Sequence, residues 1–363
     1  MTTGRALVTG ASGYIGGQLV GPLLEAGWTV RVLTRSAAGV SEQPWYPRVE
    51  TVVGDATDEA DVRAALTDVD VAYYLLHSMD GRGDFTRRDR VMAGTFASAA
   101  GNAGVRRIVY LSGIHPPAAE DVELSAHLGS RAEVGEIFLD GPAPAAVLQA
   151  AVVLGRGSTS FDMLRYLTDR LPAMIAPRWL HSRIQPIAIA DVLHYLVGAA
   201  TLPTAVNRTF DIAGPDVLTY EDMIQRFAAL TGQRRRLIVT VPVLTVGLAS
   251  HWVGFVTPVS PGVAKPLVGS LIHDVVAHEN DLDALVGAPP GGGTGFDEAV
   301  RTAMRGVPHA GGAAWVPQAV GGVVGHLAGS ALDGVGHLTG WARGRIGAAA
   351  RWGRPADRPG RMR

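Results

Sequence analysis

Short apolar runs alternate with longer amphipathic segments over the first 150 residues. Residues 5–9 form an apolar run that leads into a glycine-rich turn, and leucines at positions 19, 23 and 24 follow at helical spacing. This alternation then repeats. The expected strands cover residues 5–9, 30–33, 49–53, 71–76, 107–111 and 145–149, and the other expected helices cover 58–66, 85–103 and 125–139.

Strands that alternate with helices of this length predict a Rossmann fold, a doubly wound parallel α/β sheet, over residues 1–150. In such a sheet the first strand-to-helix turn lies at the carboxyl edge, where ligands bind. Beyond residue 150 we expect helices over 161–171, 190–200 and 220–231 and a strand at 209–212. We therefore predict a smaller, mainly helical C-terminal substrate lobe over 151–305, which partly continues the sheet, and a Gly/Ala/Arg-rich tail over 306–363.

One long segment of the second lobe, residues 237–264, contains no Asp, Glu, Lys or Arg. It is long enough to cross a bilayer, but Pro242, Pro258 and Pro261 interrupt it. We interpret it as buried helices of the lobe. A surface that contacts a membrane or a lipophilic ligand is the alternative.

The composition narrows the classes of function. With 47% apolar and 18% charged residues the chain can build a packed core, and its formal net charge of -1 does not favour nucleic acid. It has no cysteine, which excludes thiolate chemistry and cysteine-ligated metals, and its histidines form no metal motif. We predict a cytoplasmic protein with a small-molecule substrate, no metal and no nucleic-acid partner. Membrane contact is not favoured, and the oligomeric state stays open.

The turn after the first strand reads Gly10-Ala-Ser-Gly13-Tyr-Ile-Gly16. A pyrophosphate needs backbone N–H donors at a helix N-terminus, and glycines let the backbone approach it closely. Because this turn follows a strand and opens a helix, we predict that a dinucleotide binds here. A purely structural glycine turn is the alternative. The predicted cofactor contacts in the turn are Gly10, Ser12, Gly13, Tyr14, Ile15 and Gly16.

The end of the second strand indicates which dinucleotide binds. NAD-binding proteins usually place a carboxylate there to bond the ribose hydroxyls, whereas this chain has Arg35. Since arginine can pair with a 2'-phosphate, NADP (NADPH) is favoured and NAD is the alternative; an exposed loop arginine would carry no such role. Asp55 and Ala56 follow the third strand, where we expect the adenine amine, although Asp55 can instead cap a helical turn.

These residues resemble the short-chain dehydrogenase/reductase superfamily, in its atypical, NmrA-like and extended branches. The matching segments are 9–16, Arg35, 54–58 and 108–112. The chain also resembles a bacterial family of NAD(P)H-binding oxidoreductase-like proteins, on residues 77–85, 127–135 and 177–196. That resemblance covers about residues 5–305 and implies cofactor binding. Longer members carry a C-terminal domain of unknown function, which we expect the tail to replace here.

Typical members of the superfamily carry Tyr-x-x-x-Lys on the helix after the fifth strand, where the tyrosine exchanges a proton with the substrate. This chain has one lysine, Lys265, far outside that helix. His127 and Arg131 stand on that helix at the same spacing, so one helix face carries both. His127 can exchange a proton near neutral pH and Arg131 can hold the cofactor. A surface pair near Glu133 and Glu136 is the alternative.

Two other strand ends carry candidate residues. Ser112 ends the fifth strand, where the resemblance implies a hydroxyl that polarises the substrate. Leu76 and His77 end the fourth strand, beside the expected nicotinamide ribose, although a lone histidine often has no direct role.

In the second lobe, Arg178 and Arg183 flank Trp179. The resemblance implies that this segment faces the cleft, where it can grip an anionic or aromatic group. A solvated loop in which arginine stacks on tryptophan is the alternative.

Together these features predict an NADP-dependent oxidoreductase that acts on a carbonyl or conjugated acceptor held between the lobes. Ser112 polarises the acceptor, His127 or water supplies the proton, and Arg131 anchors the cofactor. One alternative is a non-catalytic NADPH-binding redox sensor or assembly protein. Another is a membrane-adjacent reductase of a lipophilic, quinone-like substrate.

Overall fold

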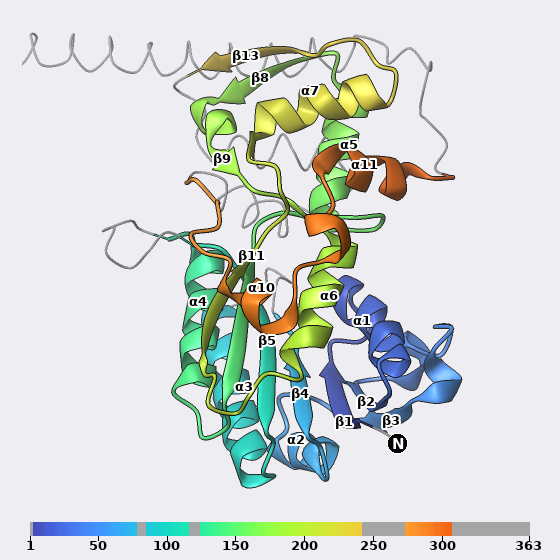
Figure 1. Cartoon of the computed structure of the whole chain (residues 1–363), viewed down its shortest axis with the longest axis vertical. Helices are drawn as coiled ribbons and strands as arrows, with labels where there is room; N and C mark the ends of the chain where they lie inside the picture. The colour runs from blue at the N-terminus through green and yellow to red at the C-terminus, as the bar shows by residue number, and fades with distance from the viewer. Residues whose placement is uncertain (1–2, 78–84, 116–123, 242–272, 307–363) are drawn as a thin grey trace, which may run out of the picture. The chain divides into compact units, whose positions relative to one another are not determined.

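The computed structural model describes residues 3–77, 85–115, 124–241 and 273–306, all of which lie within one compact unit, residues 1–311. Its main feature is a seven-stranded parallel sheet in the order β11-β6-β5-β4-β1-β2-β3 (Figure 1). The Rossmann-type α/β sheet is therefore confirmed. Its strands are β1 Gly4–Thr9, β2 Trp28–Thr34, β3 Glu50–Val53, β4 Val71–Tyr74, β5 Arg107–Gly113, β6 Ala145–Ala150 and β11 Arg208–Ile212.

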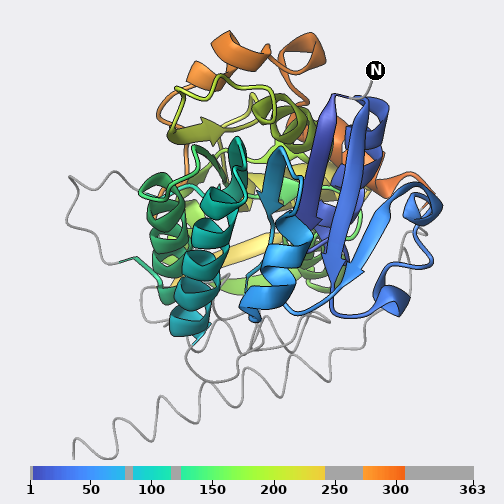
Figure 2. The ribbon, with the colours of Figure 1, turned by 90° about the horizontal axis from the view of Figure 1, so that it is seen from below.

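Helices cover both faces of this sheet. Core residues of α1 (Tyr14–Glu25) and α6 (Ile189–Ala199) pack on one face, and those of α2 (Glu59–Leu66), α3 (Phe85–Asn102) and α4 (Ala126–Leu139) pack on the other (Figure 2). Successive residues of β5 point to opposite faces of the sheet: Val109 belongs to the core on the side of α1 and α6, and Tyr110 to the core on the side of α4. A strand buried on both faces needs this near-continuous apolar sequence.

The start of α4 sets the position of two predicted site residues. Ser125 is the N-cap of this helix, and its hydroxyl oxygen accepts a hydrogen bond from the backbone N–H of Leu128 at 3.2 Å. A serine cap satisfies a backbone donor that the first helical turn leaves unpaired. His127 and Arg131 therefore lie in the first two turns of α4, next to the carboxyl ends of the sheet strands.

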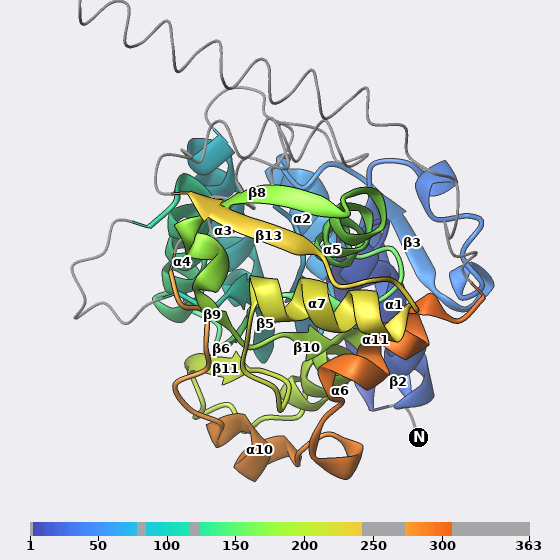
Figure 3. The same cartoon turned by 90° about the horizontal axis from the view of Figure 1, so that it is seen from above.

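The second lobe has a core of its own. Helices α5 (Thr159–Arg170), α7 (Tyr220–Leu230) and α11 (Phe296–Met304) surround it, beside the parallel pair β8 (Ala173–Pro177) and β13 (Leu237–Val241) (Figure 3). The short pairs are β7 (Val153–Leu154) with β10 (Ile187–Ala188) and β9 (Arg183–Ile184) with β12 (Leu218–Thr219). The other elements are helix α10 (Asp281–Val286) and the 3-10 turns η1 (Ala37–Gly39), η2 (Tyr46–Arg48), η3 (Arg178–His181) and η4 (Pro290–Gly292).

One end of the uncharged segment, residues 237–264, does not form the expected helix. Leu237–Val241 form strand β13, so the helical interpretation is wrong there; four of these five residues are β-branched and favour a strand beside β8. The rest of the segment, residues 242–264, lies outside the described residues, as do Lys265 and residues 307–363 of the expected tail. Among the helices that are described, none is long and apolar enough to span a bilayer.

Candidate cofactor and substrate site

The glycine turn between β1 and α1 has a shape that side chains would destroy. Gly10 has φ +73°, and a Cβ there would lie 2.5 Å from the carbonyl oxygen of Leu75. A Cβ on Gly16 would lie 2.4 Å from the carbonyl oxygen of Gly10. Gly13 is the N-cap of α1 and offers no side-chain cap, so the first N–H groups of the helix stay open to a ligand. This cradle fits the pyrophosphate of a dinucleotide.

A cavity of about 330 Å³ begins at this turn and extends into the second lobe. It brings together the β1–α1 turn, the ends of β4 and β5, and the start of α4. The predicted site residues in its lining are Gly10, Gly13, Tyr14, Ile15, Gly16, Leu76, His77, Ser112, His127 and Arg131. The other four, Ser12, Arg35, Asp55 and Ala56, do not line it.

Arg35 and Asp55 lie at the ends of β2 and β3, and both are exposed. The Asp55 carboxylate accepts hydrogen bonds from the backbone N–H and the hydroxyl of Thr57, at 2.9 and 2.8 Å. These bonds hold the pKa of Asp55 below its usual value, and the charge of Arg35 adds to them although burial opposes. Asp55 thus shapes the turn before α2, whose N-cap is Asp58.

Ser112 is buried at the carboxyl end of β5, with 3% of its surface exposed. Its hydroxyl donates a long hydrogen bond, 3.4 Å, to the carbonyl oxygen of Arg131. The guanidinium of Arg131 in turn donates to the carbonyl oxygen of Leu111 and lies 5.6 Å from the ring centroid of Tyr110. Arg131 is therefore tied to the end of β5. The nearby Glu133 carboxylate is paired with Arg90.

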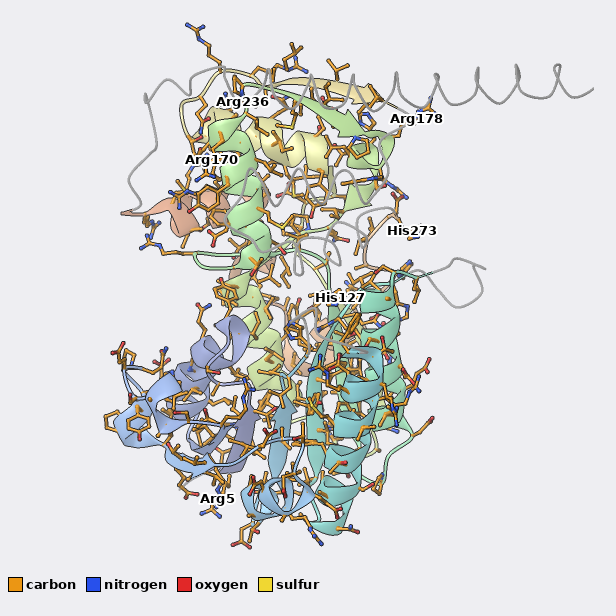
Figure 4. The ribbon with its side chains drawn as sticks, turned by 180° about the vertical axis from the view of Figure 1, so that it is seen from behind. Arg5, His127, Arg170, Arg178, Arg236 and His273 are labelled. Atoms are coloured by element: carbon orange, nitrogen blue, oxygen red, sulfur yellow. The ribbon has the colours of Figure 1, made fainter. Side chains whose placement is uncertain are left out.

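Two histidines that line the cavity lie close together. The ring centroids of His77 and His127 are 6.4 Å apart, with His127 at the start of α4 (Figure 4). Burial, with the nearby charge of Arg131, lowers the pKa of His77 to about 4, although this residue keeps exposed surface; surrounding protein atoms desolvate its ring. Burial, then Arg131 and His77, lower the pKa of His127 to about 3.

Both imidazoles are therefore neutral at neutral pH. A neutral imidazole can donate or accept a hydrogen bond, but it does not gain or lose a proton near pH 7. This differs from the expectation that His127 exchanges a proton there. The difference is caused by burial and by the neighbouring Arg131 and His77, and this burial cannot be read from the helix sequence alone.

The far wall of the cavity is apolar, and sequence reasoning missed most of it. Its apolar residues from the second lobe include Met163, Leu164, Leu167, Trp179, Ile184, Ile224 and Val275. Helical spacing on α5 was the available signal, but the same spacing describes any core-facing helix. Only Trp179 was anticipated. Among the described lining residues, Arg131 is the one side chain that carries a charge at neutral pH.

The two arginines expected beside Trp179 do not reach this cavity. Arg183 donates to the Asp274 carboxylate at 2.8 Å, and Arg178 lies at the outer edge of the second lobe (Figure 4). The predicted grip on an anionic group is therefore wrong at this position. The local reason is that successive residues around a 3-10 turn face different directions, so that Trp179 points inward and its neighbours do not.

Comparison with known proteins finds a family match over the first part of the chain. Residues 10–150 match the NAD(P)H-binding family. A 3-beta-hydroxysteroid dehydrogenase of Mycolicibacterium neoaurum is 36% identical over 117 residues, which are 30% of this chain and 31% of that protein. A ceramide reductase of Caulobacter vibrioides is 27% identical over 243 residues, 65% of this chain and 73% of that protein. The match thus spans about a third of the steroid dehydrogenase.

Solved structures share the fold over most of the chain. A triphenylmethane reductase of Citrobacter sp., in complex with NADP(H), has a TM-score of 0.63 and 17% identity, over 82% of this chain and 99% of that one. An NAD-dependent NDP-hexosamine 5,6-dehydratase has a TM-score of 0.60 and 18% identity, over 84% of this chain and 97% of that one. At such identities the likeness shows the fold alone, and the two neighbours use different dinucleotides.

Proposed function

We propose that the chain is an NAD(P)H-dependent oxidoreductase that reduces a carbonyl or conjugated acceptor on an apolar small molecule, since residues 10–150 match the NAD(P)H-binding family. One observation carries the proposal. A single cavity runs from the glycine cradle, past Ser112 and Arg131, to the apolar wall of the second lobe. A cavity with apolar walls and a few convergent polar groups is the usual form of a small-molecule site.

The cofactor end would be held by the backbone of the glycine turn. The open N–H groups of α1 suit the pyrophosphate, and Tyr14 and Ile15 line the adjoining wall. We propose NADPH as the preferred form, with NADH as the alternative, because Arg35 is exposed at the end of β2 and can meet a 2'-phosphate. When bound, the reduced nicotinamide supplies a hydride to the acceptor.

The substrate end selects for apolar, uncharged molecules. A carboxylate or phosphate would lose its hydration against Met163, Leu164 and Ile224 without meeting a cation there. The names of two relatives, a steroid dehydrogenase and a ceramide reductase, point to apolar compounds as well. We therefore propose a lipophilic substrate whose reactive carbonyl reaches Ser112.

Three side chains would act around that carbonyl. Ser112 donates a hydrogen bond to the carbonyl oxygen and polarises it. Neutral His127 donates a second hydrogen bond, and its low pKa keeps it from serving as a cationic acid. Arg131, which donates to the Leu111 carbonyl oxygen and lies over the Tyr110 ring, would place positive charge near the oxygen on which negative charge develops.

A substrate panel tests this proposal. Purified protein with NADPH is offered apolar ketones and quinones, each paired with an analogue that carries a carboxylate, and the absorbance of the reduced nicotinamide is followed. We expect oxidation of NADPH with apolar compounds and at least tenfold less with their charged analogues. Tight NADPH binding without oxidation by any compound would contradict the proposal and favour a non-catalytic sensor.

A further inference from the structure

Three buried polar residues form a row across neighbouring strands beside the site. Ser112 on β5 pairs in register with Gln149 on β6, and Gln149 pairs with Asp211 on β11. They are 3%, 7% and 9% exposed, which is rare for such side chains inside a sheet. Parallel strands in register place paired side chains on the same face, about 4.8 Å apart. The row therefore leads from the reactive serine toward the edge of the sheet.

Two histidines extend this row. The Nε2 atom of His115, just beyond β5, lies 2.8 Å from the side-chain amide nitrogen of Gln149. Asp211 accepts hydrogen bonds from the backbone N–H of His278 at 2.8 Å and from its Nδ1 at 3.2 Å. The side chain of His278 is 50% exposed, so this end of the row reaches solvent.

The row borders a second cavity, of about 430 Å³, between α4 and the strands β6 and β11. Its polar lining residues are Ser112, His115, Glu136, Gln149, Thr209 and His278. Because one water molecule occupies about 30 Å³, the cavity has room for a hydrogen-bonded chain of waters. Ser112 lines this cavity and also the cavity at the glycine turn, and it is therefore the point where the two meet.

We propose that this second cavity delivers the proton of the reaction, with His115 as the group that passes it to Ser112 and Gln149 as the residue that positions His115. The inference rests on the proposed reductase function. Imidazole is the side chain that exchanges protons most readily between pH 5 and 8. His115 would also supply the proton that the tyrosine of the Tyr-x-x-x-Lys motif provides in typical members of the superfamily.

The proposed reaction transfers a hydride and a proton to the carbonyl group of the substrate. The hydride carries two electrons to the carbonyl carbon, the carbon–oxygen π bond breaks, and the oxygen becomes anionic. The Ser112 hydroxyl gives its proton to that oxygen, so the substrate leaves as an alcohol. Protonated His115, through water in the cavity, returns a proton to Ser112 and becomes neutral. Solvent at the exposed end beside His278 then restores the proton on His115.

The surroundings of the two cavities support this assignment. The pKa values of His77 and His127 lie far below neutrality, so neither carries a transferable extra proton at pH 7. Among the described residues that line the second cavity, the titratable groups besides His115 are Glu136 from α4 and His278, whose Nδ1 lies 3.2 Å from the Asp211 carboxylate.

The test compares His115→Ala with His181→Ala, whose histidine is exposed and lies outside both cavities. We expect His115→Ala to lower kcat at pH 7 about 100-fold, the contribution typical of a general acid. Its NADPH dissociation constant should stay within twofold, and added imidazole should restore part of kcat. If the wild type reduces substrates and His115→Ala keeps its full kcat, the inference is overturned.

A second measurement needs no activity and separates this inference from the proposed function. The His115 imidazole is titrated by NMR in the cofactor-free protein, for the wild type, Gln149→Leu, Gln149→Glu and His181→Ala. We expect its midpoint to move in Gln149→Leu, to rise in Gln149→Glu and to stay unchanged in His181→Ala. Midpoints that are the same in all four proteins would refute the positioning role of Gln149, even if no substrate is found.

Discussion

The two cavities that meet at Ser112 both contain histidines, and the surroundings of these histidines differ. On the cofactor side, His77 and His127 lie against an apolar wall and beside Arg131, and their pKa values fall to about 4 and 3. On the other side, His115 and His278 are hydrogen-bonded to an amide and a carboxylate. The difference teaches that the pKa of His77 and His127 follows from their burial and from the charge of Arg131 rather than from their position in a motif.

The largest expected effect tests whether a cofactor binds at the glycine turn, where the apolar cavity begins. In Gly16→Ala the new Cβ would lie 2.4 Å from the Gly10 carbonyl oxygen, so the turn must shift. We expect NADPH affinity, measured by fluorescence titration, to fall more than 100-fold. The matched control is Gly21→Ala in the same helix, where a Cβ meets nothing within 4 Å. A Gly16→Ala protein that binds NADPH as tightly as this control would contradict the cradle.

A charge reversal at Arg35 tests which of the two dinucleotides is the cofactor. Arg35→Glu should weaken NADPH binding about 30-fold, the loss of a charge-assisted pair of about 2 kcal/mol, and change NADH binding less than twofold. Arg63→Glu, an exposed arginine on α2, serves as the control for net charge. Equal losses for the two dinucleotides would show that no 2'-phosphate contact exists at Arg35.

A carboxylate introduced into the apolar wall of the cavity tests whether the substrate binds against that wall. Leu167 is half-buried on α5 and lines the cavity, so Leu167→Asp should fold yet place a charge against the substrate. We expect KM for an apolar ketone to rise about tenfold, with NADPH affinity unchanged, because the lost apolar contact is worth roughly 1.5 kcal/mol. Val217→Asp, an exposed position away from the cavity, should leave KM as it is. Unchanged kinetics in Leu167→Asp would place the substrate elsewhere.

The smallest expected effect is on the pH dependence of the free energy of unfolding. Burial, with Arg131 and His77, lowers the pKa of His127 from 6.5 to about 3, so below pH 6.5 the unfolded chain binds a proton that the folded chain does not. The free energy of unfolding must then fall as pH falls from 6.5 toward 3. In cofactor-free protein, His127→Leu should reduce this fall by about 1 kcal/mol at pH 5.5, measured by urea unfolding. The exposed His181→Leu should retain the wild-type slope; identical slopes in all three proteins would show that His127 is not desolvated.

Sequence alone was sufficient for the regular half of the molecule. The alternation of apolar runs and helices follows from a sheet covered on both faces, and it located all seven strands of the sheet, including β11. The glycine turn was also predictable, because only glycine tolerates the approach of Leu75 to Gly10. Ser112 followed from its place at the end of β5.

The polar side of the site was not predictable in this way. Ser112, Gln149 and Asp211 become neighbours only through strand register, and no local pattern records that β11 lies next to β6. His278 joins the row through a contact with Asp211 far away in sequence. The short strands of the second lobe, of two residues in four cases, give too little periodicity to be recognised.

The most direct test of the account is a single-turnover reaction of the wild type and Ser112→Ala with bound NADPH and an apolar ketone. Because Ser112 is where the two cavities meet, the account predicts that the reduced-nicotinamide absorbance decays in the wild type and at least 100-fold more slowly in the variant, with equal NADPH affinity. Equal rates in the two proteins, or no decay in the wild type with any ketone, would contradict it.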